Sequence, residues 1–159
     1  MDIKRQYQLD LSVTLIPVWF NAPPTIRIGV NGVLKNVILD KETTFNYSYA
    51  KEESVNFFQI ELYGKTNKDC NLVLNQDTAV TIDKIKFNDI ESPHFIWNGI
   101  YRPIYEHSYI QDCAKNGIKL ETELNNASYL GWNGIWTLEY NLPVFTWIHK
   151  VENLGWIYD

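Results

Sequence analysis

Apolar and polar residues alternate one by one along much of this 159-residue chain. The first run places apolar side chains at every second position from Tyr7 to Leu15, and a second run covers residues 43–49. Successive side chains of a β-strand point to opposite faces, so a period of two predicts strands with one buried face and one solvated face. A chain patterned in this way is expected to form antiparallel sheets.

The pair Asn31-Gly32 separates two apolar runs, Thr25–Val30 and Val33–Leu39. A two-residue turn between antiparallel strands requires positive φ at both of its central residues, and Asn followed by Gly meets this requirement best. The sequence therefore predicts a β-hairpin at this point.

Three further strands are predicted. Residues 55–63 form a nearly continuous apolar run, which is typical of a strand covered on both sides. Residues 78–87 alternate, but the step from Ile82 to Ile85 breaks the period and indicates a β-bulge near Asp83-Lys84. Residues 136–142 alternate again, and Pro143 ends them.

Short strands separated by turn signals, without a convincing amphipathic helix, predict an all-β fold. We expect one domain over residues 1–159, an antiparallel β-sandwich of the jelly-roll type. Residues 64–76 have the polar composition of a long loop. Residues 106–128 are the least patterned segment and are expected to be an excursion loop, with a short helical turn at 110–115 as an alternative.

The segment 129–159 concentrates aromatic side chains, including four of the six tryptophans. Large aromatic surfaces must be covered, either by the same chain or by another molecule. In the second case the segment is an aromatic C-terminal arm, and its interface anchors are Trp132, Trp136, Trp147, Trp156 and Tyr158. The sequence leaves both alternatives open.

The chain carries a formal charge of −5 and no basic run longer than Lys4-Arg5. Phosphate binding needs a concentrated cationic face, so we expect no nucleic-acid partner. No stretch approaches the ~18 apolar residues that span a bilayer, and the N-terminus lacks the apolar core of a secretion signal. We therefore expect no membrane partner, and assembly in a cytoplasm.

Candidate chemistry is sparse in the sequence. None of the common nucleophile, phosphate-loop or dinucleotide motifs occurs, and Glu121 and Glu123 lie in a polar segment typical of a solvated face, so no catalytic residue is predicted. Cys70 and Cys113 lack metal-ligand spacing and are expected to be a buried thiol and a loop thiol, with a disulfide as the alternative. No cofactor is required, but Asp69 and Asp77 are candidate ligands for a loop-held calcium ion.

Residues 25–90 resemble the small calcium-dependent carbohydrate-binding modules appended to bacterial xylanases. The shared features are the Ile26–Gly32 hairpin, a polar loop, and Asp77 leading into a strand that closes on Asn88-Asp89-Ile90. The run Leu72-Val73-Leu74-Asn75-Gln76 replaces the Gly-rich run of those modules. The resemblance implies a β-sandwich that binds sugar hydroxyls through calcium.

A second resemblance depends on three aromatic segments, Phe95–Gly99, Gly131–Gly134 and 145–159. These segments are similar to a family of short uncharacterised proteins of tailed phages that infect marine cyanobacteria. That resemblance implies a virion component or a protein made during infection, and no activity.

Two functions follow as hypotheses. The first is a non-catalytic structural protein of a phage particle, docked to other virion proteins or to itself through the C-terminal arm. The alternative is a carbohydrate-binding module for a host-surface glycan, with exposed rings as a stacking platform. The candidate rings are Trp19, Phe20, Tyr101 and Tyr105.

Overall fold

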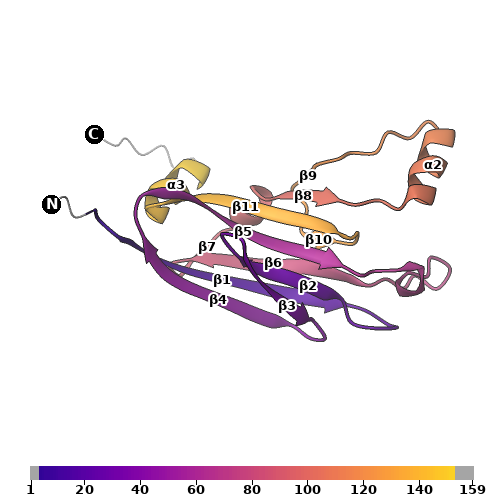
Figure 1. Ribbon diagram of the computed structural model, residues 1–159, viewed down its shortest axis with the longest axis horizontal. Helices are drawn as coiled ribbons and strands as arrows, with labels where there is room; N and C mark the ends of the chain where they lie inside the picture. Colours follow the sequence, from indigo (N-terminus) through magenta and orange to yellow (C-terminus); the bar gives the residue numbers. More distant parts are fainter. Residues whose placement is uncertain (1–3, 153–159) are drawn as a thin grey trace.

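The structure is a computed structural model that describes residues 4–152 (Figure 1). Its strands are β1 (Tyr7–Val18), β2 (Thr25–Val30), β3 (Val33–Ile38), β4 (Thr43–Lys51), β5 (Ser54–Tyr63), β6 (Ala79–Phe87), β7 (Ile90–Glu91), β8 (Ile100–Pro103), β9 (Leu124–Asn125), β10 (Tyr129–Leu130) and β11 (Gly134–Leu142). Its helices are α1 (Pro93–Trp97), α2 (His107–Lys115) and α3 (Val144–Glu152), with a 3-10 turn η1 (Asn67–Asp69).

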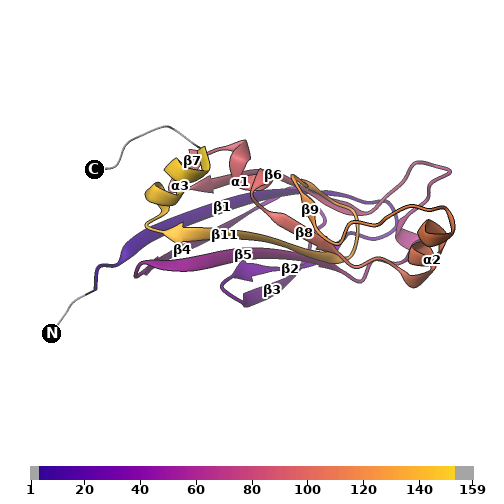
Figure 2. The ribbon, with the colours of Figure 1, turned by 90° about the horizontal axis from the view of Figure 1, so that it is seen from above.

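The strands form two sheets that run along the long axis of the molecule (Figures 1 and 2). One sheet has the order β10-β6-β1-β4, with β7 paired to β6, and the other has the order β3-β2-β5-β11-β8-β9. The strand pairs are antiparallel, and apolar residues from both sheets form one buried cluster between the layers. The predicted antiparallel β-sandwich is confirmed.

The alternating pattern of β1 gives the buried face that it predicts. Leu9, Leu11, Val13 and Leu15 are at most 1% exposed. The neighbouring β6 follows β1 in register until Thr14 faces Lys84 and Leu15 faces Ile82, so one residue of β6 is left over. The β-bulge predicted from the broken alternation is therefore confirmed.

The Asn31-Gly32 hairpin is also confirmed. Val30 pairs with Val33, and the two turn residues have φ values of 51° and 82°. Both values lie in the left-handed region that this turn requires. The expectation for residues 55–63 is only partly right, because Val55 is 61% exposed and Phe57 is 36% exposed. The strand β5 is thus covered on one side.

The sequence offers no convincing amphipathic helix, but the structure contains three helices within residues 4–152. In α1, Pro93 occupies the first turn and the Ser92 hydroxyl accepts a hydrogen bond from His94 N, so the helix has a favourable N-terminal cap. In α3, Val144, Trp147 and Ile148 are buried at a spacing of three and four residues, which places them on one helical face. None of the helices described within residues 4–152 is long and apolar enough to cross a bilayer.

Two of the predicted interface anchors lie inside this chain's own core. Trp136 on β11 is fully buried, and Trp147 on α3 is 8% exposed with its ring 5.2 Å from that of Phe87 and 5.6 Å from that of Phe95. Their assignment as docking residues is wrong, because the sandwich itself covers them. The predicted anchors Trp156 and Tyr158 lie outside the described residues.

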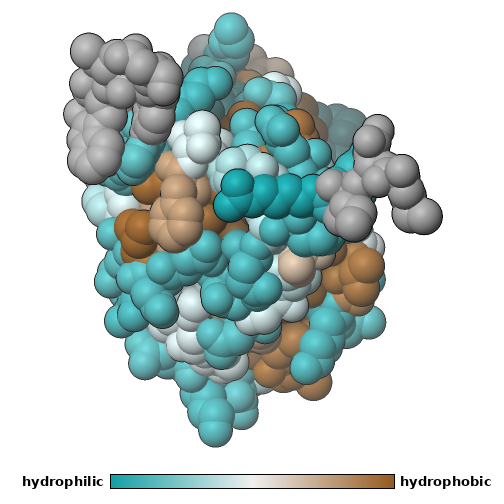
Figure 3. Space-filling view, turned by 90° about the vertical axis from the view of Figure 1, so that its left-hand side faces the viewer, coloured by the Kyte–Doolittle hydropathy of each residue, from teal (hydrophilic) through white to brown (hydrophobic). Residues whose placement is uncertain are grey.

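The end of the sandwich where α3 lies is mostly hydrophilic, with separate hydrophobic patches between the polar residues (Figure 3). The range 106–128, predicted to be an excursion loop with a short helical turn at 110–115 as an alternative, contains α2, so the helical alternative is confirmed. This helix lies at the opposite end of the molecule (Figure 1). A second group of aromatic side chains gathers beside α2.

Candidate functional site

A cleft of about 710 Å³ lies beside α2. Three segments that are distant in sequence line it: the loop 65–77, the stretch 101–112 that leads into α2, and the turn 129–133. Ligand sites commonly have volumes in this range, a mainly apolar lining and a few polar groups.

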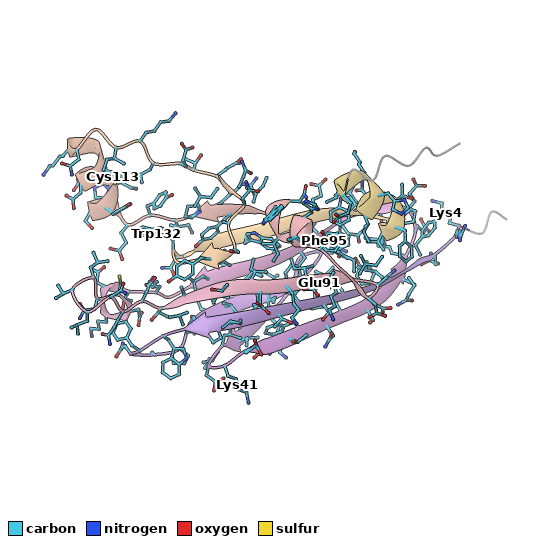
Figure 4. The ribbon with its side chains drawn as sticks, turned by 180° about the vertical axis from the view of Figure 1, so that it is seen from behind. Lys4, Lys41, Glu91, Phe95, Cys113 and Trp132 are labelled. Atoms are coloured by element: carbon cyan, nitrogen blue, oxygen red, sulfur yellow. The ribbon has the colours of Figure 1, made fainter. Side chains whose placement is uncertain are left out.

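Three aromatic rings form a cluster beside the cleft, and two of them, Trp132 and Tyr109, line it. The ring of Trp132 lies 4.7 Å from that of Tyr109 and 5.1 Å from that of Tyr105, and the two tyrosine rings are 5.8 Å apart. Tyr109 is 38% exposed, and Trp132 is half-buried between α2 and the strands (Figure 4).

Tyr101 holds the turn that carries Trp132. Its hydroxyl donates a hydrogen bond to Trp132 O and accepts one from Trp132 N at 3.0 Å. Burial raises the pKa of Tyr101, so the hydroxyl keeps its proton at ordinary pH. Because Tyr101 is only 1% exposed, its predicted role as a stacking ring for sugar is wrong. Its two hydrogen bonds to the backbone of Trp132 hold the turn in place.

A buried cation and a carboxylate connect two walls of the cleft. Lys65 Nζ lies 2.5 Å from Asp77 Oδ1 and donates to Gly131 O at 2.6 Å, while the Tyr129 hydroxyl donates to Asp77 Oδ2 at 2.6 Å. Burial acts to raise the pKa of the Asp77 carboxyl, but the hydrogen bonds from Lys65 and Tyr129 and the charge of Lys65 outweigh it. The pKa is therefore below its usual value.

Asn133 fixes the loop 65–77 against the same turn. Its side-chain amide accepts a hydrogen bond from Lys65 N and donates one to Lys65 O, both at 3.0 Å. Two backbone groups of the loop are thus satisfied by one side chain. With the Lys65 ammonium on Gly131 O, this pairing gives the cleft a fixed floor.

The rim of the cleft is polar and exposed. Glu106, Ser108 and Asp112, on and just before α2, line the opening, and Asn67 faces them from η1. Carboxylates accept hydrogen bonds and hydroxyls both donate and accept, so the rim suits a ligand with many hydroxyl groups.

The predicted calcium ligands do not fit a cation site. Both carboxylate oxygens of Asp77 already accept hydrogen bonds, and the ammonium of Lys65 supplies the positive charge there. Asp69 accepts from Thr66 N at 2.9 Å and so caps η1. Among residues 4–152, no three or more His, Cys, Asp or Glu side chains gather as ligands for a metal ion. Asp69 and Asp77 are structural residues instead.

Of the predicted rings, the buried Tyr101 lines the cleft, and Tyr105 lies behind it, with its ring 5.1 Å from that of Trp132. Trp19 is 42% exposed, and its indole N–H donates to Asp40 O at 3.1 Å, while Phe20 is half-buried beside it; neither lines the cleft. Tyr109 and Tyr129 line the cleft, but they are not among the binding residues predicted from the sequence. A signal existed for Tyr109, since it follows Tyr105 at a spacing of four residues.

The two cysteines are free thiols, so the alternative of a disulfide is not realised. Cys113 on α2 is buried, and Cys70 is half-buried in the loop that lines the cleft. Of the two carboxylates Glu121 and Glu123, the second forms an ion pair on the surface, where Glu123 lies 3.2 Å from Arg102.

No protein-family model matches the chain, and no curated protein matches it. One solved structure is similar, the selenomethionine form of vCBM60, from work on two families of calcium-dependent carbohydrate binding modules. The likeness has a TM-score of 0.49 and 12% sequence identity, and it covers 84% of this chain and 91% of that one. A likeness at this level identifies no binding residue, and the fold described above depends on the strand pairing alone.

Proposed function

We propose that this protein binds a glycan, without catalysis, in the cleft beside α2. The observation that carries the proposal is the pair of rings Trp132 and Tyr109 in a cleft with a polar rim, with Tyr105 packed against both rings.

Sugar rings have apolar faces made of C–H groups and edges made of hydroxyl groups. The face of an aromatic ring carries partial negative charge and attracts such C–H groups, so a sugar face stacks favourably on Trp or Tyr. Tyr109 and Trp132 come from two different elements and contact each other at 4.7 Å, so they form one continuous aromatic surface on which a sugar ring can stack.

The hydroxyl edges of a sugar need hydrogen-bonding partners when they leave water. Glu106 and Asp112 provide acceptors at the rim, and Ser108 provides both a donor and an acceptor. A rim with two carboxylates disfavours anionic sugars, because like charges repel. The preferred ligand is therefore a neutral oligosaccharide.

The cleft supports binding better than hydrolysis. A general acid that works near neutral pH needs a raised pKa, whereas the pKa of Asp77 is lowered by its contacts with Lys65 and Tyr129. The carboxylate is thus held ionised and serves to keep the cleft walls together.

The alternative hypothesis, a docking arm in a phage particle, receives less support from the described residues. Two of its anchors, Trp136 and Trp147, are buried in this chain, and a third, Trp132, lies in the cleft. The phage setting and the virion partners remain predictions from the sequence resemblance.

A glycan array probed with the intact chain and with Trp132→Ala and Tyr109→Ala tests the proposal. Loss of one stacking ring should weaken binding of the recognised glycan by about tenfold. Trp97→Ala is a matched control, because Trp97 is a 49% exposed tryptophan on α1 and does not line the cleft.

The proposal fails if the intact chain binds no neutral glycan on the array. It also fails if Trp97→Ala weakens binding as much as Trp132→Ala does, provided that circular dichroism shows that both variants are folded. A Trp19→Ala variant distinguishes the cleft from the other predicted platform, and binding should be unchanged in it.

A further inference from the structure

The strand β3 is an edge strand that is exposed along most of its length, and only Val37 packs partly against the core. It is the terminal strand of the six-stranded sheet, and no residue of it is buried. Val33 is 80% exposed, Ile38 is 67% exposed and Leu34 is 40% exposed. Figure 2 shows the β2–β3 hairpin at the margin of the molecule, with no described element beyond β3.

The other sheet ends in a different kind of edge. In β4, half-buried residues alternate with exposed ones, as in a strand that covers a core. An exposed apolar edge strand is a template for pairing with another strand, because its outward N–H and C=O groups have no ladder partner. The question is which strand fits β3.

The direction of the backbone groups restricts the answer. Leu39 N donates to Pro24 O at 2.9 Å, so the backbone of residue 39 faces β2. Val33, next to the two-residue turn, pairs with Val30 and shares this parity. Because backbone direction alternates along a strand, the outward groups of β3 are those of Leu34, Asn36 and Ile38.

In an antiparallel pair, outward residues must face outward residues. If β3 pairs with β3 of a second copy about a two-fold axis at Asn36, then Leu34 faces Ile38 twice and Lys35 faces Val37. If the axis lies at Lys35, two ammonium groups face each other directly, which is unfavourable. The register centred on Asn36 thus pairs apolar Leu34 with Ile38 on both sides of the axis and avoids the like-charge pair.

We propose that two copies of this chain associate through β3, antiparallel, with Asn36 on the two-fold axis. The contact joins two six-stranded sheets into one continuous sheet, and each partner contributes the same strand. The paired strands alone bury less than the ~1,200 Å² of a standard stable interface, so the dimer is weak and depends on concentration.

Such a dimer contains two clefts, one in each copy of the chain. A ligand with repeated sugar units is then held at two points, and its apparent affinity rises without any new contact. The association itself does not require the glycan, so its test is independent of the proposed function.

Sedimentation velocity of the intact chain over a range of concentrations tests the proposal, with Asn36→Lys and Asn36→Asp as variants. Each variant alone places two like charges on the axis and should remain a monomer where the intact chain is a dimer. An equal mixture of the two places Lys opposite Asp and should restore the dimer. Only the register centred on Asn36 gives this rescue.

Asn46→Lys is a matched control, because Asn46 is exposed on β4, the edge strand of the other sheet. It should not change the association. The proposal is overturned if the intact chain is a monomer at every concentration, if Asn36→Lys dimerises as well as the intact chain, or if the mixture fails to restore the dimer. It is also overturned if Asn46→Lys abolishes the dimer.

Discussion

Gly99 lies directly against the indole of Trp136. A Cβ atom added to Gly99 would lie far inside contact distance of the ring atoms Cζ2 and Cε2 of Trp136. The indole is fully buried on β11, with β5 on one side and β8 on the other, so it has no free space to move away. The absence of a side chain at position 99 is thus a condition for closing the core.

We predict that Gly99→Ala lowers the free energy of unfolding by about 1–3 kcal/mol, because it overpacks the core at Trp136. Chemical denaturation measures the change. The double variant Gly99→Ala/Trp136→Phe is the control, since phenylalanine lacks the ring atoms that meet the added methyl group. Equal costs of Gly99→Ala in both backgrounds would contradict the assigned contact.

The Lys65–Asp77 pair should contribute to stability. The side chains are 13% and 31% exposed, so water screens the pair only in part. We expect Asp77→Asn to lower the free energy of unfolding by about 1–2 kcal/mol at neutral pH. Lys65→Met should cost more than the double variant Lys65→Met/Asp77→Asn, because it leaves a carboxylate without its cation. A double variant as unstable as Lys65→Met would argue against the pair.

The same pair predicts a pH dependence. The pKa of Asp77 is lower in the folded chain than its ordinary value of 3.8, so the folded state favours the ionised form. The contribution of Asp77 is complete above its ordinary pKa and is lost as the pH falls through the lower folded value. The difference in stability between the intact chain and Asp77→Asn should therefore be constant at neutral pH and shrink below about pH 4. A difference that grows in acid would show that the sign is wrong.

Trp147 and Trp132 should behave differently when they are replaced. Trp147 is 8% exposed and packs on Phe87 and Phe95, so Trp147→Ala should cost about 3–5 kcal/mol of stability. Trp132→Ala should cost less stability and mainly reduce glycan binding. Thermal unfolding and a binding assay on the same samples separate the two effects. Similar stability losses in both variants would place Trp132 in the core rather than in a binding site.

Removal of divalent cations should leave glycan binding unchanged. Lys65 already supplies positive charge to Asp77, and Asp69 is used to cap η1. We expect equal affinities in calcium and in excess chelator, and no rise in the melting temperature when calcium is added. A calcium-dependent affinity would mean that the cation is held by oxygen atoms other than those of Asp69 and Asp77.

The sequence was most informative where local rules determine the structure. The alternation in β1, the bulge opposite Thr14 and Leu15, and the Asn31-Gly32 turn were all predictable, because each depends on neighbouring residues. The helix α3 was not predicted, since the short, mainly apolar run between Pro143 and His149 fits a short strand as well as a buried helix. Its packing on the β-sheet decides the outcome.

The candidate site was less predictable than the fold. Aromatic composition alone did not distinguish Trp136, which fills the core, from Trp132, which lines the cleft, although the two are four residues apart. Their difference comes from position, because Trp132 is in a turn and Trp136 is in the middle of a paired strand. Likewise, Asp69 and Asp77 in the loop 65–77 indicate a calcium site from sequence alone. Only the structure shows that Asp77 is already paired with Lys65.

The stretches that form the cleft, 65–77, 101–112 and 129–133, lie apart along the chain and meet only after both sheets have paired. Peptides cut from this protein, or a selection display of its aromatic segments alone, should therefore retain no affinity. Recognition here is a property of the completed tertiary structure.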